Sequence, residues 1–203
     1  MTPPPRARRV GVFGGSFDPV HRAHVALAES ALAELRLDEL RWIPAGQPWQ
    51  KARKVTEAAH RVAMVHLAIA HEPRFVLDRI ELDRAGASYT IDTLRELAAA
   101  QPNSEWFVLI GQDQYAGLHT WRDWQGLLGL ATLVVANRPG KPLPVHAEVL
   151  RQPHRALPLP MLDIASTDIR ERAARGEDTS ALVPPPVARY IETHGLYRPT
   201  PRS

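Results

Sequence analysis

Apolar runs alternate along the chain with segments in which apolar residues recur every three or four positions. The first apolar run, over 8–15, contains β-branched valines and ends in two glycines, a pattern typical of a buried strand. The next segment, over 21–36, places Val25, Leu27 and Leu35 on one broad apolar stripe. That spacing predicts an amphipathic helix directly after the strand.

The same patterns predict further strands and helices as far as the C-terminus. Strands are expected over 39–45, 74–82, 105–111, 131–140 and, more weakly because of its prolines, 154–165. Helices are expected over 56–71, with Thr56 as N-cap, and over 90–101, 120–130, 166–176 and 184–195. Strands that alternate with helices indicate an α/β fold, a Rossmann-like, doubly wound, mostly parallel sheet with helices on both faces. Ligands bind such sheets beyond the carboxyl ends of the strands, at the switch point.

Length and composition narrow the domain organisation. The 203 residues suit one domain, which we expect over 9–203, preceded by a disordered basic tail over 1–8. No apolar run approaches the roughly 18 residues of a membrane helix, and no apolar segment follows the tail as in a secretory signal. We therefore expect no membrane partner. The absence of cysteine excludes disulfides and thiolate metal sites, and fits a cytoplasmic location.

The net charge and its distribution also limit the kinds of molecule that the protein is expected to bind. The formal net charge is +3, and the excess is spread along the chain. A nucleic-acid groove would need a denser basic cluster with aromatic residues between the charges. We therefore expect no nucleic-acid partner, and the excess charge is explained by a solvated surface or by an anionic small molecule.

The first strand ends at a candidate ligand loop. Gly14 and Gly15 lack a Cβ, so they permit positive φ and a close approach of the backbone to a ligand. The pattern lacks the last glycine of GxGxxG and the GK[ST] of a P-loop. Asp18 and Pro19 are predicted to be the N-cap and first residue of the following helix.

Two histidines follow this loop. His21 and His24 are three residues apart, so they would share one face near the start of the helix. A helix N-terminus offers N–H groups and a partial positive charge to phosphate oxygens. A histidine pair with this spacing can also bind a metal, but no third ligand stands near it in the sequence. We therefore predict a phosphate site with no protein metal site.

Short motifs give a more specific expectation. "GGSFDPVHRAH" over 14–24 resembles the signature GG(S/T)FDPxHxGH of the nucleotidyltransferases that carry the (H/T)xGH motif. "IASTDIR" over 164–170 resembles their second motif, ISSTxIR. "SYTIDTL", "IGQD", "TW" and "NRPG" occur between them in the order found in nicotinate-nucleotide adenylyltransferases. The resemblance covers about residues 9–197, and it departs from the family at Ala23, Gln50 and Ala165.

The resemblance implies a role for particular residues. The catalytic residues would be His21, His24 and Arg170, with His24 and Arg170 facing the triphosphate. ATP would bind at Gly14, Gly15, Ser16, Phe17, Ser166 and Thr167, where Ser166 and Thr167 would cap a helix. Nicotinate mononucleotide would bind at Lys51, Thr90, Asp113, Trp121 and Arg138. Trp121 would stack on the pyridine ring, while N–H groups near Thr90 and Trp121 would hold its carboxylate. Asp113 would contact the ribose and Arg138 the phosphate, whereas Trp124 is assigned to the core.

The implied reaction needs no general base. A phosphate with a second pKa near 6 is already largely ionised at neutral pH, and it attacks the α-phosphorus of ATP. Mg²⁺ would be held mainly by phosphate oxygens and water. Two alternatives stay open: an enzyme that uses nicotinamide mononucleotide, and a non-catalytic nucleotide-binding module on the same scaffold. The oligomeric state is expected to be monomer or homodimer.

Overall fold

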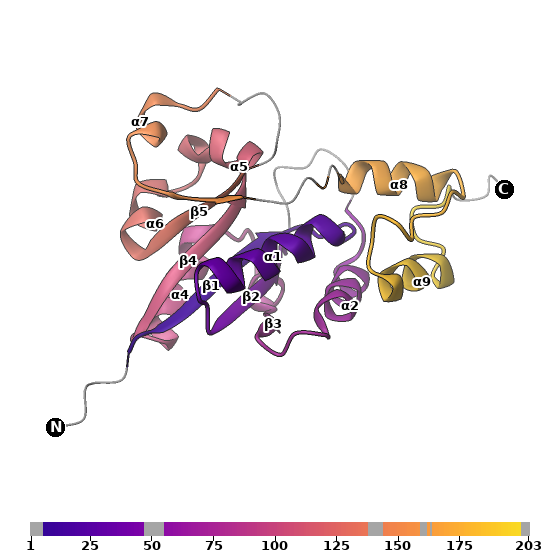
Figure 1. The fold of residues 1–203 in the computed structure, drawn as a ribbon, viewed down its shortest axis with the longest axis horizontal. Coiled ribbons are helices and arrows are strands. Elements are labelled where there is room, and N and C mark those ends of the chain that lie inside the picture. Colours follow the sequence, from indigo (N-terminus) through magenta and orange to yellow (C-terminus); the bar gives the residue numbers. More distant parts are fainter. Residues whose placement is uncertain (1–5, 47–54, 138–143, 159–161, 163, 200–203) are drawn as a thin grey trace.

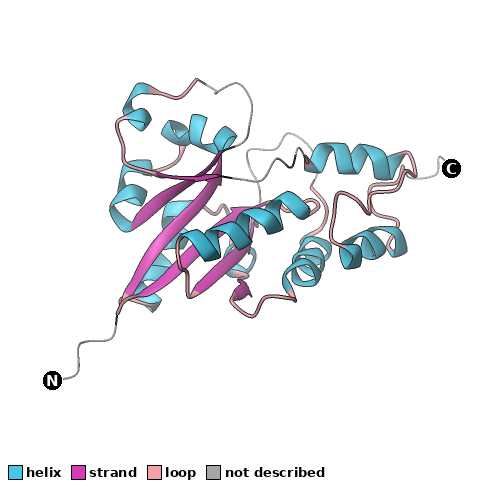
Figure 2. Ribbon diagram, viewed as in Figure 1, coloured by secondary structure: helices cyan, strands magenta, loops and turns pink. Residues whose placement is uncertain are grey.

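A parallel β-sheet forms the centre of the molecule (Figures 1 and 2). The computed structural model describes residues 6–46, 55–137, 144–158, 162 and 164–199. The strand order is β3-β2-β1-β4-β5-β6, and neighbouring strands all pair in parallel. The strands are β1 (Arg8–Gly15), β2 (Glu39–Pro44), β3 (Phe75–Leu77), β4 (Ser104–Gly111), β5 (Ala131–Asn137) and β6 (Arg155–Pro158). The sequence order reverses between β1 and β4, which is the switch point of a doubly wound sheet.

Helices cover both faces of this sheet (Figure 2). The helices are α1 (Arg22–Glu34), α2 (Ala58–Ile69), α3 (Ile80–Asp83), α4 (Thr90–Ala100), α5 (Gln112–Ala116), α6 (Trp124–Leu130), α7 (Ala147–Leu150), α8 (Ser166–Ala174) and α9 (Pro185–Thr193), with a 3₁₀ turn at Leu118–Thr120. The α/β fold expected from the alternating pattern is confirmed.

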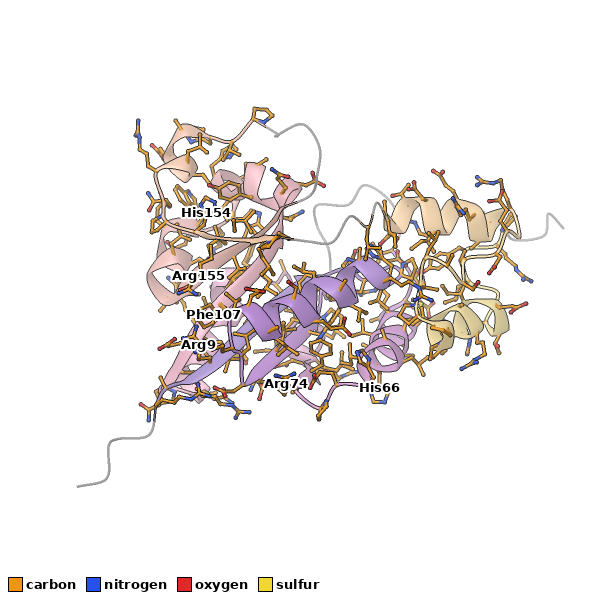
Figure 3. All side chains as sticks on the ribbon, viewed as in Figure 1. Arg9, His66, Arg74, Phe107, His154 and Arg155 are labelled. Carbon is orange, nitrogen blue, oxygen red and sulfur yellow. The ribbon has the colours of Figure 1, made fainter. Side chains whose placement is uncertain are left out.

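The two faces have separate apolar cores. Along β4, Trp106, Val108 and Ile110 pack into one core with residues of α4, α5 and α6. Phe107 and Leu109 point the other way, into a core built with α1, α2, α8 and α9. This period of two is what a strand buried on both faces requires. The edge of the second core is closed by Arg9, whose guanidinium carbon lies 4.6 Å from the centre of the Phe107 ring (Figure 3).

The N-terminal boundary differs from the expectation. Arg8 is the first residue of β1, in agreement with the strand predicted over 8–15, so the tail expected over 1–8 does not extend that far. Arg6 donates to both carboxylate oxygens of Asp38, at 2.6 and 3.1 Å. The described residues therefore include Arg6 and Ala7, and residues 1–5 of the expected tail lie outside them.

Two predicted elements are wrong in part. The strand expected over 74–82 stops at Leu77, because the Asp78 carboxylate accepts the Ile80 N–H and turns the chain before helix α3, whose N-cap is Arg79. The helix expected over 120–130 begins only at Trp124, because Asp123 is its N-cap and accepts the Gly126 N–H. Each boundary is set by an aspartate side chain that accepts a backbone N–H two or three residues further along the chain. In the part of the chain that the structure describes, no helix is long and apolar enough to cross a membrane.

Candidate active site

A cavity of about 500 Å³ opens at the switch point of the sheet. Its floor contains the carboxyl ends of β1, at Gly14 and Gly15, and of β4, at Ile110 and Gly111. Residues from α1, α4, α5 and α8 complete the wall. The position is where parallel α/β sheets bind ligands, so this cavity is the candidate active site.

The two glycines provide space, and they do not provide an unusual backbone conformation. Positive φ among the described glycines occurs only at Gly86, Gly176 and Gly195. A Cβ on Gly15 would lie 3.1 Å from the Phe17 ring, and one on Gly14 would point into open space with its nearest neighbour 4.0 Å away. Gly14 and Gly15 therefore do not use the positive φ that glycine permits. The left-handed residue of this loop is Phe17, with a φ of 47°.

The histidine pair begins helix α1. His21 is the N-cap, and His24 occupies the third helical position. The two rings stack with centroids 3.6 Å apart, and the His21 N–H donates to Nδ1 of His24 at 3.2 Å. Since Nδ1 accepts, the proton of a neutral His24 ring lies on Nε2. Both residues line the cavity, and their assignment to phosphate stays a prediction.

Asp18 does not begin the helix, contrary to the prediction. It is fully buried, and the Asp18–Pro19 pair lies in a turn before the N-cap. Its carboxylate accepts the Thr56 N–H at 3.3 Å and the Tyr197 hydroxyl at 2.8 Å. Thr56 is likewise not an N-cap, because Glu57 holds that position in α2. Asp18 and Pro19 therefore form a turn with a buried carboxylate, where the sequence predicted the start of a helix.

The second motif meets the first at this turn. Ser166 Oγ donates to the Pro19 carbonyl at 3.1 Å, across 147 residues of sequence. Arg170 Nη1 donates to the Asp18 carbonyl at 2.8 Å, and its Nη2 donates to Thr167 Oγ1 at 3.0 Å. The N-cap of α8 is Ala165, so the prediction that Ser166 and Thr167 cap this helix is wrong. Their side chains bond the loop and Arg170 instead.

Arg61 holds the same loop from the other side. This α2 side chain is only 2% exposed. It donates to the carbonyls of Thr56, Ser16 and Ala45, each at 2.9 Å. Burial lowers the pKa of Arg61 from its ordinary value, and the nearby Asp18 opposes that shift. Sequence reasoning missed this residue, because one arginine in an amphipathic helix looks like a solvated charge.

The opposite wall of the cavity carries the residues predicted for the second nucleotide. Thr90 is the first residue of α4, Asp113 lies in α5, and Trp121 follows the 3₁₀ turn. All three line the cavity. The N–H of Trp121 itself donates to the Leu118 carbonyl at 2.9 Å, so that amide is already used within the turn. Trp124 is buried in the core, as expected.

This wall also contains charged residues that the sequence did not single out. Glu81 lies in the cavity wall, where burial raises the pKa of its carboxyl and the Thr93 hydroxyl donates to it at 3.1 Å. Arg122 lines the same wall, with its guanidinium carbon 4.9 Å from the centre of the Tyr89 ring and Nη1 3.6 Å from Asp92. The motif "SYTIDTL" indicates this part of the site from the sequence, but the position of Glu81 beside it follows only from the fold.

Most predicted site residues come together in this one cavity. The predicted residues that line it are Gly14, Gly15, Ser16, Phe17, His21, His24, Thr90, Asp113, Trp121 and Ser166. Thr167 and Arg170 are not among the residues that line the cavity, and Arg170 contacts the loop through the Asp18 carbonyl. Lys51 and Arg138 lie outside the described residues, so their assignments stay predictions.

Known proteins share both the sequence and the fold. The profile of the Cytidylyltransferase-like family matches residues 12–172. A protein of Methylibium petroleiphilum named "Probable nicotinate-nucleotide adenylyltransferase" is 50% identical, over 95% of this chain and 93% of its own length. A protein of Bordetella petrii with the same name is 49% identical, over 94% of this chain and 100% of its own.

Solved structures agree with the fold. The nicotinic acid mononucleotide adenylyltransferase of Plasmodium falciparum, complexed with NaAD, superposes with a TM-score of 0.78, covering 94% of this chain and 97% of that one at 21% identity. The same enzyme complexed with APC gives the same TM-score at 19% identity. Taken with the family match and the close relatives, the sequence places this chain among the nicotinate-nucleotide adenylyltransferases of the cytidylyltransferase-like family.

Proposed function

We propose that this protein transfers the adenylyl group of ATP to nicotinate mononucleotide, giving nicotinate adenine dinucleotide and pyrophosphate. One observation carries the proposal: a single cavity joins the histidine loop of β1 and α1 to the wall that holds Thr90 and Trp121. An adenylyl transfer needs two anionic nucleotides side by side, and the cavity has one wall suited to each.

The chemistry is mainly one of positioning. An oxygen of the mononucleotide phosphate bonds to the α-phosphorus of ATP, and the bond from that phosphorus to the departing pyrophosphate oxygen breaks. The attacking phosphate has a second pKa near 6, so it needs no base at neutral pH. The protein has to align two anions that repel each other and to stabilise the charge on the leaving group.

The histidine pair is suited to this second task. We propose that His24 donates to the phosphates through Nε2, since its Nδ1 accepts the His21 N–H. His21 stacks on His24 and fixes the plane of its ring. Arg170 donates to the Asp18 carbonyl, so we propose that it acts by holding this carbonyl and by adding positive charge near the triphosphate.

Mg²⁺ is the expected metal, and it would arrive with the nucleotide. Within the described ranges, no group of three or more histidine, cysteine, aspartate or glutamate side chains is arranged to hold a metal ion. A hard divalent cation prefers oxygen ligands, which the triphosphate and water supply. When bound it would neutralise phosphate charge, while the residues of the loop keep the α-phosphorus in line with the attacking oxygen.

We also propose that the acid mononucleotide is preferred over the amide. The first N–H groups of α4, at Thr90, have no partner within their own helix and favour an anion. Trp121 lies on the same wall and would stack on the pyridine ring. An amide would present N–H₂ to these donors, and an unpaired buried donor costs about 1–3 kcal/mol. A selectivity of roughly tenfold to a hundredfold follows for one such clash.

The test is direct. The purified protein is incubated with ATP, Mg²⁺ and either nicotinate or nicotinamide mononucleotide, and the products are identified by mass. We expect nicotinate adenine dinucleotide and pyrophosphate, with a higher kcat/KM for the acid. A preference for the amide would reassign the acceptor. If ATP bound without either dinucleotide forming, the protein would be a nucleotide-binding module. We further propose that the enzyme acts in the cytoplasm as a monomer or homodimer, which light scattering distinguishes.

A further inference from the structure

The C-terminal end of the chain returns to the loop that follows β1. After α9, Gly195 and Tyr197 both adopt left-handed backbone conformations, with φ values of 58° and 69°. This turn brings the half-buried Tyr197 ring inward, and its hydroxyl donates to Oδ1 of Asp18 at 2.8 Å. The two residues are 179 positions apart in the sequence, so the contact exists only in the folded protein.

Asp18 is the point at which several distant segments meet. Its carboxylate accepts from Tyr197 and from the Thr56 N–H, while its backbone carbonyl accepts from Arg170. Asp18 is fully buried, so Tyr197 and Thr56 take the place of water at its carboxylate. Ser16 and Phe17, the two residues before it, line the cavity. A displacement of Asp18 would therefore move the wall at which ATP is proposed to bind.

We propose that Tyr197 is a positioning residue for the ATP-binding loop and acts through Asp18. The inference rests on the proposed function, since it assumes that ATP binds at the loop over 14–19. Removing the hydroxyl leaves a buried carboxylate with one donor fewer. The turn then gains freedom to shift toward other donors. A shift of about 1 Å at a reacting group is enough to cost around a hundredfold in rate, so a smaller shift has a measurable effect.

Tyr190 provides a matched control on the same C-terminal unit. It is also half-buried, and its hydroxyl lies 3.0 Å from Nδ1 of His60, which joins α9 to α2. Tyr190→Phe and Tyr197→Phe each remove one hydroxyl that is hydrogen-bonded to a distant side chain. Of the two, Tyr197 is the one that contacts the loop that follows β1. A purely structural role would give the two variants the same functional effect.

The experiment compares the parent protein, Tyr197→Phe and Tyr190→Phe. We measure kcat, the KM for each nucleotide, the ATP dissociation constant by calorimetry and the free energy of unfolding in urea. For Tyr197→Phe we expect kcat/KM for ATP to fall about tenfold, equal to about 1.4 kcal/mol, and ATP binding to weaken with it. The KM for nicotinate mononucleotide should change less than twofold, and Tyr190→Phe should stay within twofold of the parent in every kinetic constant.

Every result decides the proposal. Equal kinetic effects of the two variants, or a Tyr197→Phe protein that does not fold, would make Tyr197 a structural residue only. If the parent protein binds ATP but forms no dinucleotide, the proposed function fails, and the ATP dissociation constants still test the positioning role alone. If the parent protein binds no ATP, the inference fails together with the site.

Discussion

Replacing Arg61 should be the most destabilising single change near the site. Its guanidinium donates to three backbone carbonyls, those of Ser16, Ala45 and Thr56, and its side chain is 2% exposed. In Arg61→Met the apolar stem is retained while all three donors are lost. A hydrogen bond to a charged group contributes about 1.5–3 kcal/mol, and a buried acceptor left unsatisfied costs about 1–3 kcal/mol.

The loss of stability depends on how many of the three carbonyls can find another hydrogen-bond donor. Three full penalties would overestimate the effect, because water can enter the space that the guanidinium leaves. We expect Arg61→Met to lower the free energy of unfolding by about 3–5 kcal/mol, similar to breaking a buried ion pair. That is a large share of the roughly 5–15 kcal/mol of a typical domain. Arg61→Lys keeps the charge but lacks the planar fork, so about half of the loss should remain.

Urea unfolding followed by circular dichroism measures this effect. The control is Arg95→Met, which removes ion pairs with Asp92 and Asp123 from a side chain that is 54% exposed. Exposed pairs contribute about 0–1 kcal/mol, so this control should change little. If Arg61→Met lost no more stability than Arg95→Met, the three carbonyls would not depend on Arg61, and the explanation of its burial would be wrong.

Two other predictions concern the cavity. His24→Ala should leave the circular dichroism spectrum unchanged and lower turnover about 10²–10³-fold, because one preorganised donor is lost; near-normal turnover would remove His24 from the phosphate site. Burial raises the pKa of the Glu81 carboxyl above its ordinary value of 4.5. The protonated side chain therefore contributes stability that is fully present below pH 4.5 and is lost as the pH rises through the pKa of the folded protein. Glu81→Gln should therefore gain stability relative to the parent protein between pH 4 and pH 8 in urea unfolding, and an equal difference at both pH values would contradict this.

The elements and the position of the site could be predicted because both depend on local pattern. The apolar runs over 8–15 and 105–111 became β1 and β4, and the carboxyl ends of these strands form the floor of the cavity. The histidine pair could be placed near a helix start because the apolar stripe that follows it predicts helix α1, although the N-cap is His21 and not Asp18. The resemblance to the adenylyltransferase motifs then implied that residues of both walls belong to one site.

What could not be predicted depends on distant partners. Asp18 followed by proline is typical of a helix start, yet its carboxylate is bound by Tyr197, far along the chain. Arg61 has no local mark that separates it from a solvated arginine. The short helix α3 was missed because Ile80 and Leu82 alternate as in a strand, while the Asp78 carboxylate that accepts the Ile80 N–H turns the chain. Lys51 and Arg138, assigned to the mononucleotide, stay predictions.

The three side chains that donate to the loop from distant helices have a common physical role. The carbonyls of Ser16, Asp18 and Pro19 accept, in that order, from Arg61, Arg170 and Ser166. A carbonyl oxygen that faced the cavity would repel a triphosphate, and one buried without a donor would be unstable. Holding each oxygen against a side chain of α2 or α8 meets both requirements. The two guanidinium groups also place positive charge behind a loop that is proposed to bind an anion. Side chains of two distant helices therefore hold the loop in the form that is proposed to bind the nucleotide.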